Sequence, residues 1–181
     1  MAEEKKEKWT TYLAITTILI AVCATLSTFK GGGYSTKSLL NQTRASDQWA
    51  DYQSKSIKGY IYDLQKDKLQ LELDDMSEKN SSPKIEDEYQ NKIAGYAKRV
   101  KKYEFEKDSL KGVAREFEKV RDESKKHSEV FGMAVIFLQV SILLSSIAAL
   151  MKKKYVWFLS IAVGAIGIFY FIDGFLLFYN V

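Results

Sequence analysis

The chain has 181 residues, 46% hydrophobic and 28% charged, with a formal net charge of +4. With one histidine and one cysteine it holds no zinc ligand set of its own, and no paired acid and base or phosphate-binding loop is visible. We therefore expect no catalytic residue, no metal site and no cofactor, and a protein that is not an enzyme. Apolar and charged residues are segregated along the chain, which is typical of a membrane protein.

Three stretches nearly free of ionisable residues predict three transmembrane helices, over residues 9–29, 130–151 and 155–179. Each reaches the roughly 20 residues that a helix needs to cross about 30 Å of hydrocarbon. The first stretch follows a basic start and could be a cleaved signal peptide. We favour an uncleaved anchor, because its apolar core is long and "ATLSTF" is a poor cleavage site. A lipoprotein signal at Cys23 is less favoured, because Val22 precedes the cysteine where we expect a small residue.

Lysine clusters predict the orientation of these helices. They lie in residues 1–8, before the first span, and in residues 152–154, the turn between the second and third spans. The positive-inside rule places both clusters in the cytoplasm, so residues 30–129 and the C-terminus are expected outside it. Lys125 and Lys126 lie close to the second span and favour the opposite orientation. Long loops cross membranes largely regardless of charge, so we give the short flanks more weight.

Residues 30–129 predict a long antiparallel helical hairpin. Few turn signals occur apart from Gly31, Gly32 and Gly33 and "KNSSPK", residues 79–84, so two helices should meet near Ser81. The second helix should continue into the second span. A helix break, acting as a hinge or a corner, is expected at the three glycines, because each lowers helix propensity by about 1 kcal/mol relative to alanine.

Seven-residue repeats predict which faces of the two arms meet, and they favour a coiled coil. The repeats are Thr43, Ala50, Ile57, Leu64 and Leu71 on the first arm, and Tyr96, Tyr103, Leu110 and Phe117 on the second. Folding at Ser81 brings Ile57 near Phe105. The arms carry more aromatic surface than one helical pair can bury, which predicts a homo-oligomer. Alternatively, tyrosine rings pack along the stalk and keep their hydroxyl groups in water.

The stretch "NQTRASDQWADYQ", residues 41–53, is unusually polar for a helix of this kind. It is interpreted as an oligomer seam, in which small residues let helices approach and polar ones fix the register. A second interpretation is a ligand patch near the membrane for a small anionic or aromatic molecule, and a third is a hydrated helix face. The residues that would form the seam or patch are Gln42, Arg44, Asp47, Gln48, Trp49, Tyr52 and Gln53.

Asp173 is the only residue charged at neutral pH in the third predicted span. Intramembrane acids are costly and often functional, so one hypothesis is an ion or proton role. Because Asp173 lies near one end of the span, packing, snorkelling to the interface or an oligomer contact is favoured. Gly164, Gly167 and Gly174 suit close helix packing.

Charge balance argues against nucleic-acid binding. Residues 30–129 contain 21 Lys and Arg against 19 Asp and Glu, a net charge of +2. A nucleic-acid footprint would be strongly basic. The acids at Glu86, Asp87 and Glu88 are best explained as favourable charges at a helix start after Pro83. His127 is most simply a residue at the membrane interface.

The sequence "FKGGGYSTKSLLNQTRASDQWADYQSKSIKGYIYDLQ", residues 29–65, resembles a bacterial family of uncharacterised membrane proteins, domain of unknown function 4337. The resemblance extends to the three-span layout and implies the bacterial inner membrane, but it implies no activity. We expect an oligomeric structural, scaffolding or accessory protein whose partners are the lipid bilayer and copies of itself. The alternatives are a small channel or transport-associated protein, and an extracytoplasmic ligand sensor that works through an unidentified membrane or envelope protein.

Overall fold

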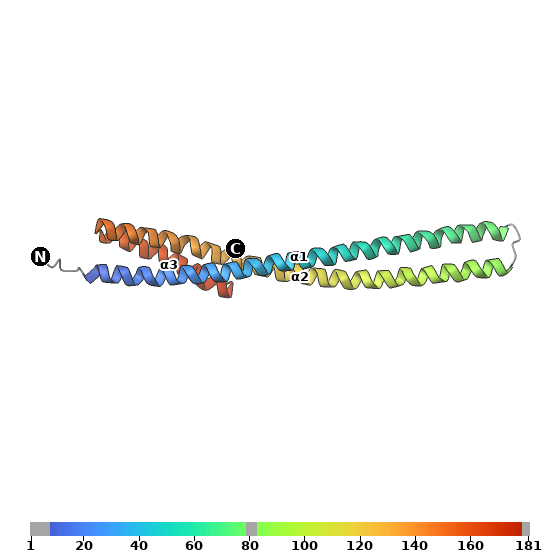
Figure 1. The fold of residues 1–181 in the computed structure, drawn as a ribbon, viewed down its shortest axis with the longest axis horizontal. Coiled ribbons are helices and arrows are strands. Elements are labelled where there is room, and N and C mark those ends of the chain that lie inside the picture. Colours follow the sequence, from blue (N-terminus) through green and yellow to red (C-terminus); the bar gives the residue numbers. More distant parts are fainter. Residues whose placement is uncertain (1–7, 79–82, 179–181) are drawn as a thin grey trace. The chain divides into compact units, whose positions relative to one another are not determined.

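The computed structural model describes residues 8–78 and 83–178, and these form three helices (Figure 1). Helix α1 is Lys8–Glu78, α2 is Pro83–Met151 and α3 is Lys154–Leu176. Each contains a stretch that is long and apolar enough to cross a membrane. The predicted all-helical fold is confirmed, and the chain is consistent with a multi-pass membrane protein. The predicted basic N-terminal residues 1–7, the turn residues 79–82 and the last predicted residue of the third span, Tyr179, lie outside the described ranges.

Helix α1 runs through Gly31, Gly32 and Gly33 without interruption, so the predicted break is wrong. The reason is the close approach of α2 at Gly31. A Cβ atom on Gly31 would lie 3.0 Å from Phe131 Cβ, and the Ser128 hydroxyl donates a hydrogen bond to the Gly31 carbonyl at 3.0 Å. Packing against a neighbouring helix here outweighs the low helix propensity of glycine.

The helix ends follow from local chemistry. Pro83 occupies the first position of α2, where its missing N–H is no loss, and Glu86 lies in the first turn, where its charge favours the helix dipole. Between α2 and α3, Lys152 has φ 51°, and the Lys153 N–H donates to the Ala148 carbonyl at 3.2 Å. The tight lysine turn predicted at residues 152–154 is therefore present, although Lys154 already belongs to α3.

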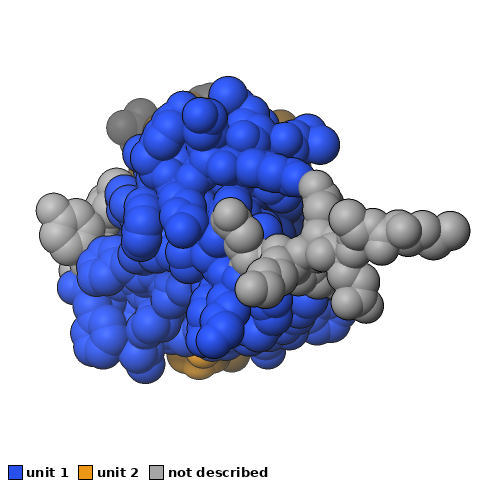
Figure 2. Space-filling view, turned by 90° about the vertical axis from the view of Figure 1, so that its left-hand side faces the viewer, with its two compact units in different colours: residues 1–40, 120–181 blue, residues 41–119 orange. Residues whose placement is uncertain are grey.

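The chain divides into two compact units, which Figure 2 colours separately. Unit 1 comprises Met1–Leu40 and Val120–Val181, and unit 2 comprises Asn41–Lys119. Unit 2 is shorter than the predicted hairpin of residues 30–129, because both ends of that segment pack within unit 1. There, the Ser38 hydroxyl donates to the Arg121 carbonyl at 3.1 Å.

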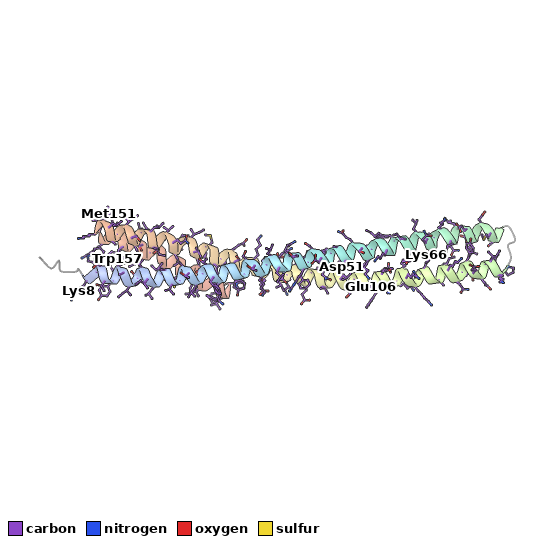
Figure 3. The ribbon with its side chains drawn as sticks, viewed as in Figure 1. Lys8, Asp51, Lys66, Glu106, Met151 and Trp157 are labelled. Atoms are coloured by element: carbon purple, nitrogen blue, oxygen red, sulfur yellow. The ribbon has the colours of Figure 1, made fainter. Side chains whose placement is uncertain are left out.

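Unit 1 is a bundle of all three helices around two small apolar clusters. One cluster contains Ile20, Ala24, Ala134 and Leu138, and the other contains Trp9, Leu13 and Ala148. Lys8 and Met151 lie at the same end of this bundle, where the Lys154 ammonium group lies 6.0 Å from the ring centre of Trp9 (Figure 3).

Glycines let α3 approach its neighbours closely. A Cβ atom would lie 2.8 Å from Ser141 Oγ at Gly164, 2.7 Å from Leu138 Cγ at Gly167 and 2.8 Å from Phe131 Cε1 at Gly174. These contacts agree with the close helix packing that the glycines predict.

In unit 2, α1 and α2 pack antiparallel. Lys55 of α1 forms an ion pair with Glu106 of α2, and Arg99 donates to the Tyr62 hydroxyl at 2.7 Å. Both pairs fit the predicted register, which places Ile57 near Phe105. The face predicted for α2 is also correct, because its repeat, Tyr96, Tyr103, Leu110 and Phe117, is half-buried.

The face predicted for α1 is wrong. The repeat of Thr43, Ala50, Ile57, Leu64 and Leu71 is exposed throughout. Instead, α1 turns small and aromatic residues towards α2, including Ala45, Trp49, Tyr52, Gly59 and Tyr62. The tyrosine rings of α2 are bulky, and a glycine opposite them leaves room: a Cβ on Gly59 would lie 3.6 Å from Tyr103 Cβ. Tyr62 stacks on Tyr103 with 5.7 Å between ring centres.

Candidate interaction surface

Two aromatic residues of the polar stretch 41–53 belong to the intrachain seam of unit 2. The indole N–H of Trp49 donates to Glu118 Oε1 at 3.0 Å, and the Tyr52 ring meets the Trp49 ring edge-on at 5.4 Å. The Arg44 guanidinium lies 5.8 Å from the centre of the Phe117 ring, a distance at which a cation and an aromatic face attract. This stretch therefore helps to hold α1 against α2.

The structure does not gather the seven predicted residues into one patch. Gln48, Trp49 and Tyr52 are half-buried in the seam, whereas the other four are exposed: Gln42, Arg44, Asp47 and Gln53. Close helix approach was predicted on four small residues of this stretch, Ala45, Ser46, Ala50 and Ser54. Ala45 is buried where α1 packs on α2 and is not available to a second copy, whereas the other three are exposed.

Lys55 and Glu106 form the central ion pair of unit 2, and Figure 3 labels Glu106 on α2. Their hydrogen bond raises the pKa of Lys55 and lowers the pKa of Glu106. Lys102 also lies 3.7 Å from the Glu106 carboxylate, and the Lys55 ammonium lies 5.6 Å from the Tyr103 ring centre. Because both side chains of the pair are about one-third exposed, solvent screens the interaction and its contribution to stability is small.

A cavity of about 50 Å³ lies beside this ion pair, between Lys55, Gly59 and Tyr103. Binding sites for small molecules usually measure roughly 300–1,000 Å³. The cavity has room for little more than water, and none of the seven predicted patch residues lines it.

An apolar stripe on α1 faces away from α2. We call it the outer stripe and define it as Ile57, Ile61, Leu64 and Leu71, whose exposed fractions are 59%, 52%, 70% and 70%. Large apolar side chains of a water-exposed surface are normally scattered, so several of them along one face of a helix indicate an interaction site. The sequence contained this signal as a seven-residue repeat, but the repeat was assigned to the wrong partner helix.

Unit 1 contains a buried hydroxyl cluster that the sequence analysis missed. Ser141 donates to the Ser160 carbonyl at 2.7 Å, Ser160 donates to the Ser141 carbonyl at 3.0 Å, and the hydroxyl oxygens of Ser145 and Ser160 are 2.6 Å apart. Hydroxyl bonds of this kind join helices inside a membrane. The available signal was the four-residue spacing of Ser141 and Ser145 on an otherwise apolar helix.

Asp173 is buried in unit 1, with 1% of its surface exposed. The snorkelling interpretation is therefore wrong, because it requires the carboxylate to reach interfacial water. Close helix packing explains the burial: the next residue, Gly174, packs against Phe131. The Asp173 carbonyl accepts a hydrogen bond from the Leu177 N–H at 2.7 Å, which ends α3.

His127 ties α2 to the end of α3. Its Nδ1 lies 2.7 Å from the Gly174 carbonyl oxygen and donates to it, and its ring stacks on Tyr34 of α1 at 4.4 Å. His127 therefore contacts both other helices of unit 1. A helix C-terminus leaves backbone carbonyls without intrahelical partners, and a histidine is well suited to satisfy one of them.

No three His, Cys, Asp or Glu side chains come together in residues 8–78 and 83–178, so these residues give no support for a metal site.

A family model described as "Domain of unknown function (DUF4337)" matches residues 9–177. The chain belongs to this family. The match to the DUF4337 family includes nearly all of α1 and the whole of α2 and α3, so the resemblance noted for residues 29–65 extends over both units. No significant match to the chain was found among curated proteins or among solved structures.

Proposed function

We propose that the protein is a homo-oligomeric scaffolding protein of the bacterial inner membrane, anchored by three helices and associating through its extracytoplasmic helical pair. The outer stripe carries this proposal, because it is an apolar row on a surface that unit 2 leaves uncovered. No chemistry is required of such a protein, only stable insertion and specific contact with other copies.

The surroundings of the outer stripe distinguish it from the other exposed apolar residues of the chain. Exposed apolar residues also cover unit 1, for example Ile18 and Leu143, but lipid covers these in a membrane protein. The outer stripe begins 28 residues after the end of the first predicted span (residue 29 to residue 57), which is about eight helical turns, lies among charged residues and faces water. Fully burying a leucine or isoleucine side chain is worth about 1.5–3 kcal/mol, so the stripe favours association.

Insertion and orientation are supported by the same three helices. Their apolar stretches have the length needed for a span, and the lysines at 152–154 form a short turn that favours the cytoplasmic side. With that orientation the helical pair of unit 2 lies outside the cytoplasm.

Native mass spectrometry of the full-length protein in detergent tests the proposal. We expect a dimer or a larger oligomer, and we expect Leu64→Ser to shift it towards monomer. Phe105→Ser is the matched control, because Phe105 is 77% exposed on α2 but lies off the stripe. Circular dichroism should show that both variants keep their helices. A monomeric wild-type protein would overturn the proposal, as would equal loss of oligomer in both variants.

The buried Asp173 favours a second candidate function, a small channel or transport-associated protein. An acid in the interior of a membrane bundle is expensive and often marks an ion or proton path. The test is ion flux into liposomes that contain the wild-type protein or Asp173→Asn. Transport predicts flux in the wild type and its loss in the variant. Equal flux, or none in either, would argue against it.

A further inference from the structure

The outer stripe has the spacing of a coiled-coil seam. From Ile57 the steps are four residues to Ile61, three to Leu64, four to Lys68 and three to Leu71. This alternation keeps one side of a helix facing a second, supercoiled helix over several turns. The partner that fits the stripe is therefore another long helix with the same period.

The helices that could pair with the outer stripe differ in the apolar side chains that they expose. The α2 helix of the same chain already occupies the other face of α1, through Tyr62 and Tyr103. The described part of α2 in unit 2 exposes only three large apolar side chains, Ile85, Phe105 and Val113, and their spacing forms no seven-residue row. Among the described residues of unit 2, the outer stripe itself is the only helix surface with a matching row, which points to a second copy of α1.

Membrane insertion fixes the direction of this second copy. Because α1 continues without a break from its apolar stretch into unit 2, two copies inserted the same way leave the membrane with the same chain direction. We propose that the outer stripes of two copies pair in parallel and in register, so that Ile57, Leu64 and Leu71 each lie opposite their own counterpart. This inference rests on the proposed self-association and specifies its surface and orientation.

Lys68 is the one charged residue within the row, and its neighbours suit this arrangement. It pairs with Glu72 at 3.8 Å in its own helix, and Asp67, the preceding residue, would lie beside Lys68 of the second copy in a parallel pair. A lysine at one seam position specifies register and the number of helices at some cost in stability.

Cysteine cross-linking in membranes tests the pairing. The background is Cys23→Ser, which removes the only native thiol, and Ile57→Cys, Leu64→Cys and Leu71→Cys are added one at a time. A disulfide needs Cα atoms within about 7 Å, so mild oxidation should give a linked dimer for each of the three. Phe105→Cys is the control and should give several-fold less.

The cross-linking and mass-spectrometry results together distinguish three ways in which the proposal could be wrong. If the wild-type protein is oligomeric by native mass spectrometry but none of the three variants cross-links above the control, the outer stripe is not the seam. If Ile57→Cys links to Leu71→Cys in mixed samples but neither links to itself, the helices are antiparallel and the proposed direction is wrong. A monomer in native mass spectrometry instead defeats the proposed function itself.

Discussion

Replacing Gly167 by alanine should destabilise unit 1, because the new methyl group has no room. Its Cβ would lie 2.7 Å from Leu138 Cγ, 2.8 Å from Leu138 Cδ2 and 3.0 Å from the Leu138 backbone nitrogen. A rotamer change could move the leucine side chain, but the backbone nitrogen moves only if α2 and α3 separate. Gly32→Ala is a matched control, because no atom lies within 4 Å of a Cβ at that position.

Comparing the stabilities of the two alanine variants isolates the free-energy cost of the close contact at Gly167. Both gain helix propensity, by up to about 1 kcal/mol, so this gain cancels to first order in the difference between them. Overpacking a close contact costs about 1–3 kcal/mol. We therefore expect Gly167→Ala to be less stable than Gly32→Ala by about 1–3 kcal/mol.

Unfolding in detergent, followed by tryptophan fluorescence, measures this difference. Trp157 is a suitable reporter within unit 1, because its ring lies 6.2 Å from that of Trp9 and its indole N–H donates to Thr16 at 3.2 Å. Gly167→Ala should lower the unfolding midpoint, and Gly32→Ala should leave it unchanged or raise it. Equal midpoints for the two variants would refute the close α2–α3 contact.

Three further outcomes are expected. Gly112→Ala should raise the melting temperature of unit 2, measured by circular dichroism, because no atom lies within 4 Å of a Cβ there and the helix gains up to about 1 kcal/mol. Ser160→Ala should lower the stability of unit 1 in detergent by about 1–2 kcal/mol, and the exposed Ser146→Ala by less. The lowered pKa of Glu106 predicts that its stabilising effect is present above the ordinary value near 4.5 and is lost as the pH falls through the lower value of the folded state. Glu106→Gln should therefore melt earlier than wild type at neutral pH, and the two should converge in acid; a constant difference would contradict this.

The long helices were predictable because their signals are local. Apolar runs of membrane-spanning length, the proline at position 83 and the absence of other breakers determine where α2 begins and that it continues into an apolar stretch. The antiparallel register followed from the position of the turn alone. The break at Gly31 was mispredicted because helix propensity is weak evidence where another helix packs on the glycine, and that neighbour, Phe131, lies a hundred positions away in the sequence.

The face of α1 that packs on α2 was predicted wrongly for a different reason. Two rows with the same period run along this helix, one strongly apolar through Leu64 and one of small and aromatic residues through Gly59 and Tyr62. Hydrophobicity alone selects the first row, whereas the bulky rings of α2 fit the second. Periodicity shows that a helix has a partner on a given side, but complementary shape decides which partner it is.

Sites made by two helices were the least predictable. Ser141 and Ser160 bind each other's backbone across α2 and α3, and His127 reaches the end of α3. The sequence offers only weak signals for these contacts, the four-residue spacing of Ser141 and Ser145 and the single histidine, and neither signal names the partner. Their pairing depends on how α3 packs after the lysine turn, which sequence spacing does not determine. Asp173 was recognisable because a charge in an apolar run is rare, but its burial follows from the same packing.

Similar exposure in the two units has opposite physical consequences. Ile18 in unit 1 is 62% exposed and Leu64 in unit 2 is 70% exposed, so area alone does not separate them. In a membrane the first contacts lipid and needs no protein partner, whereas the second contacts water and gains free energy when covered. The segregation of charge along the sequence, and not the amount of exposed apolar surface, therefore supports the proposal that copies of this chain associate through the outer stripe.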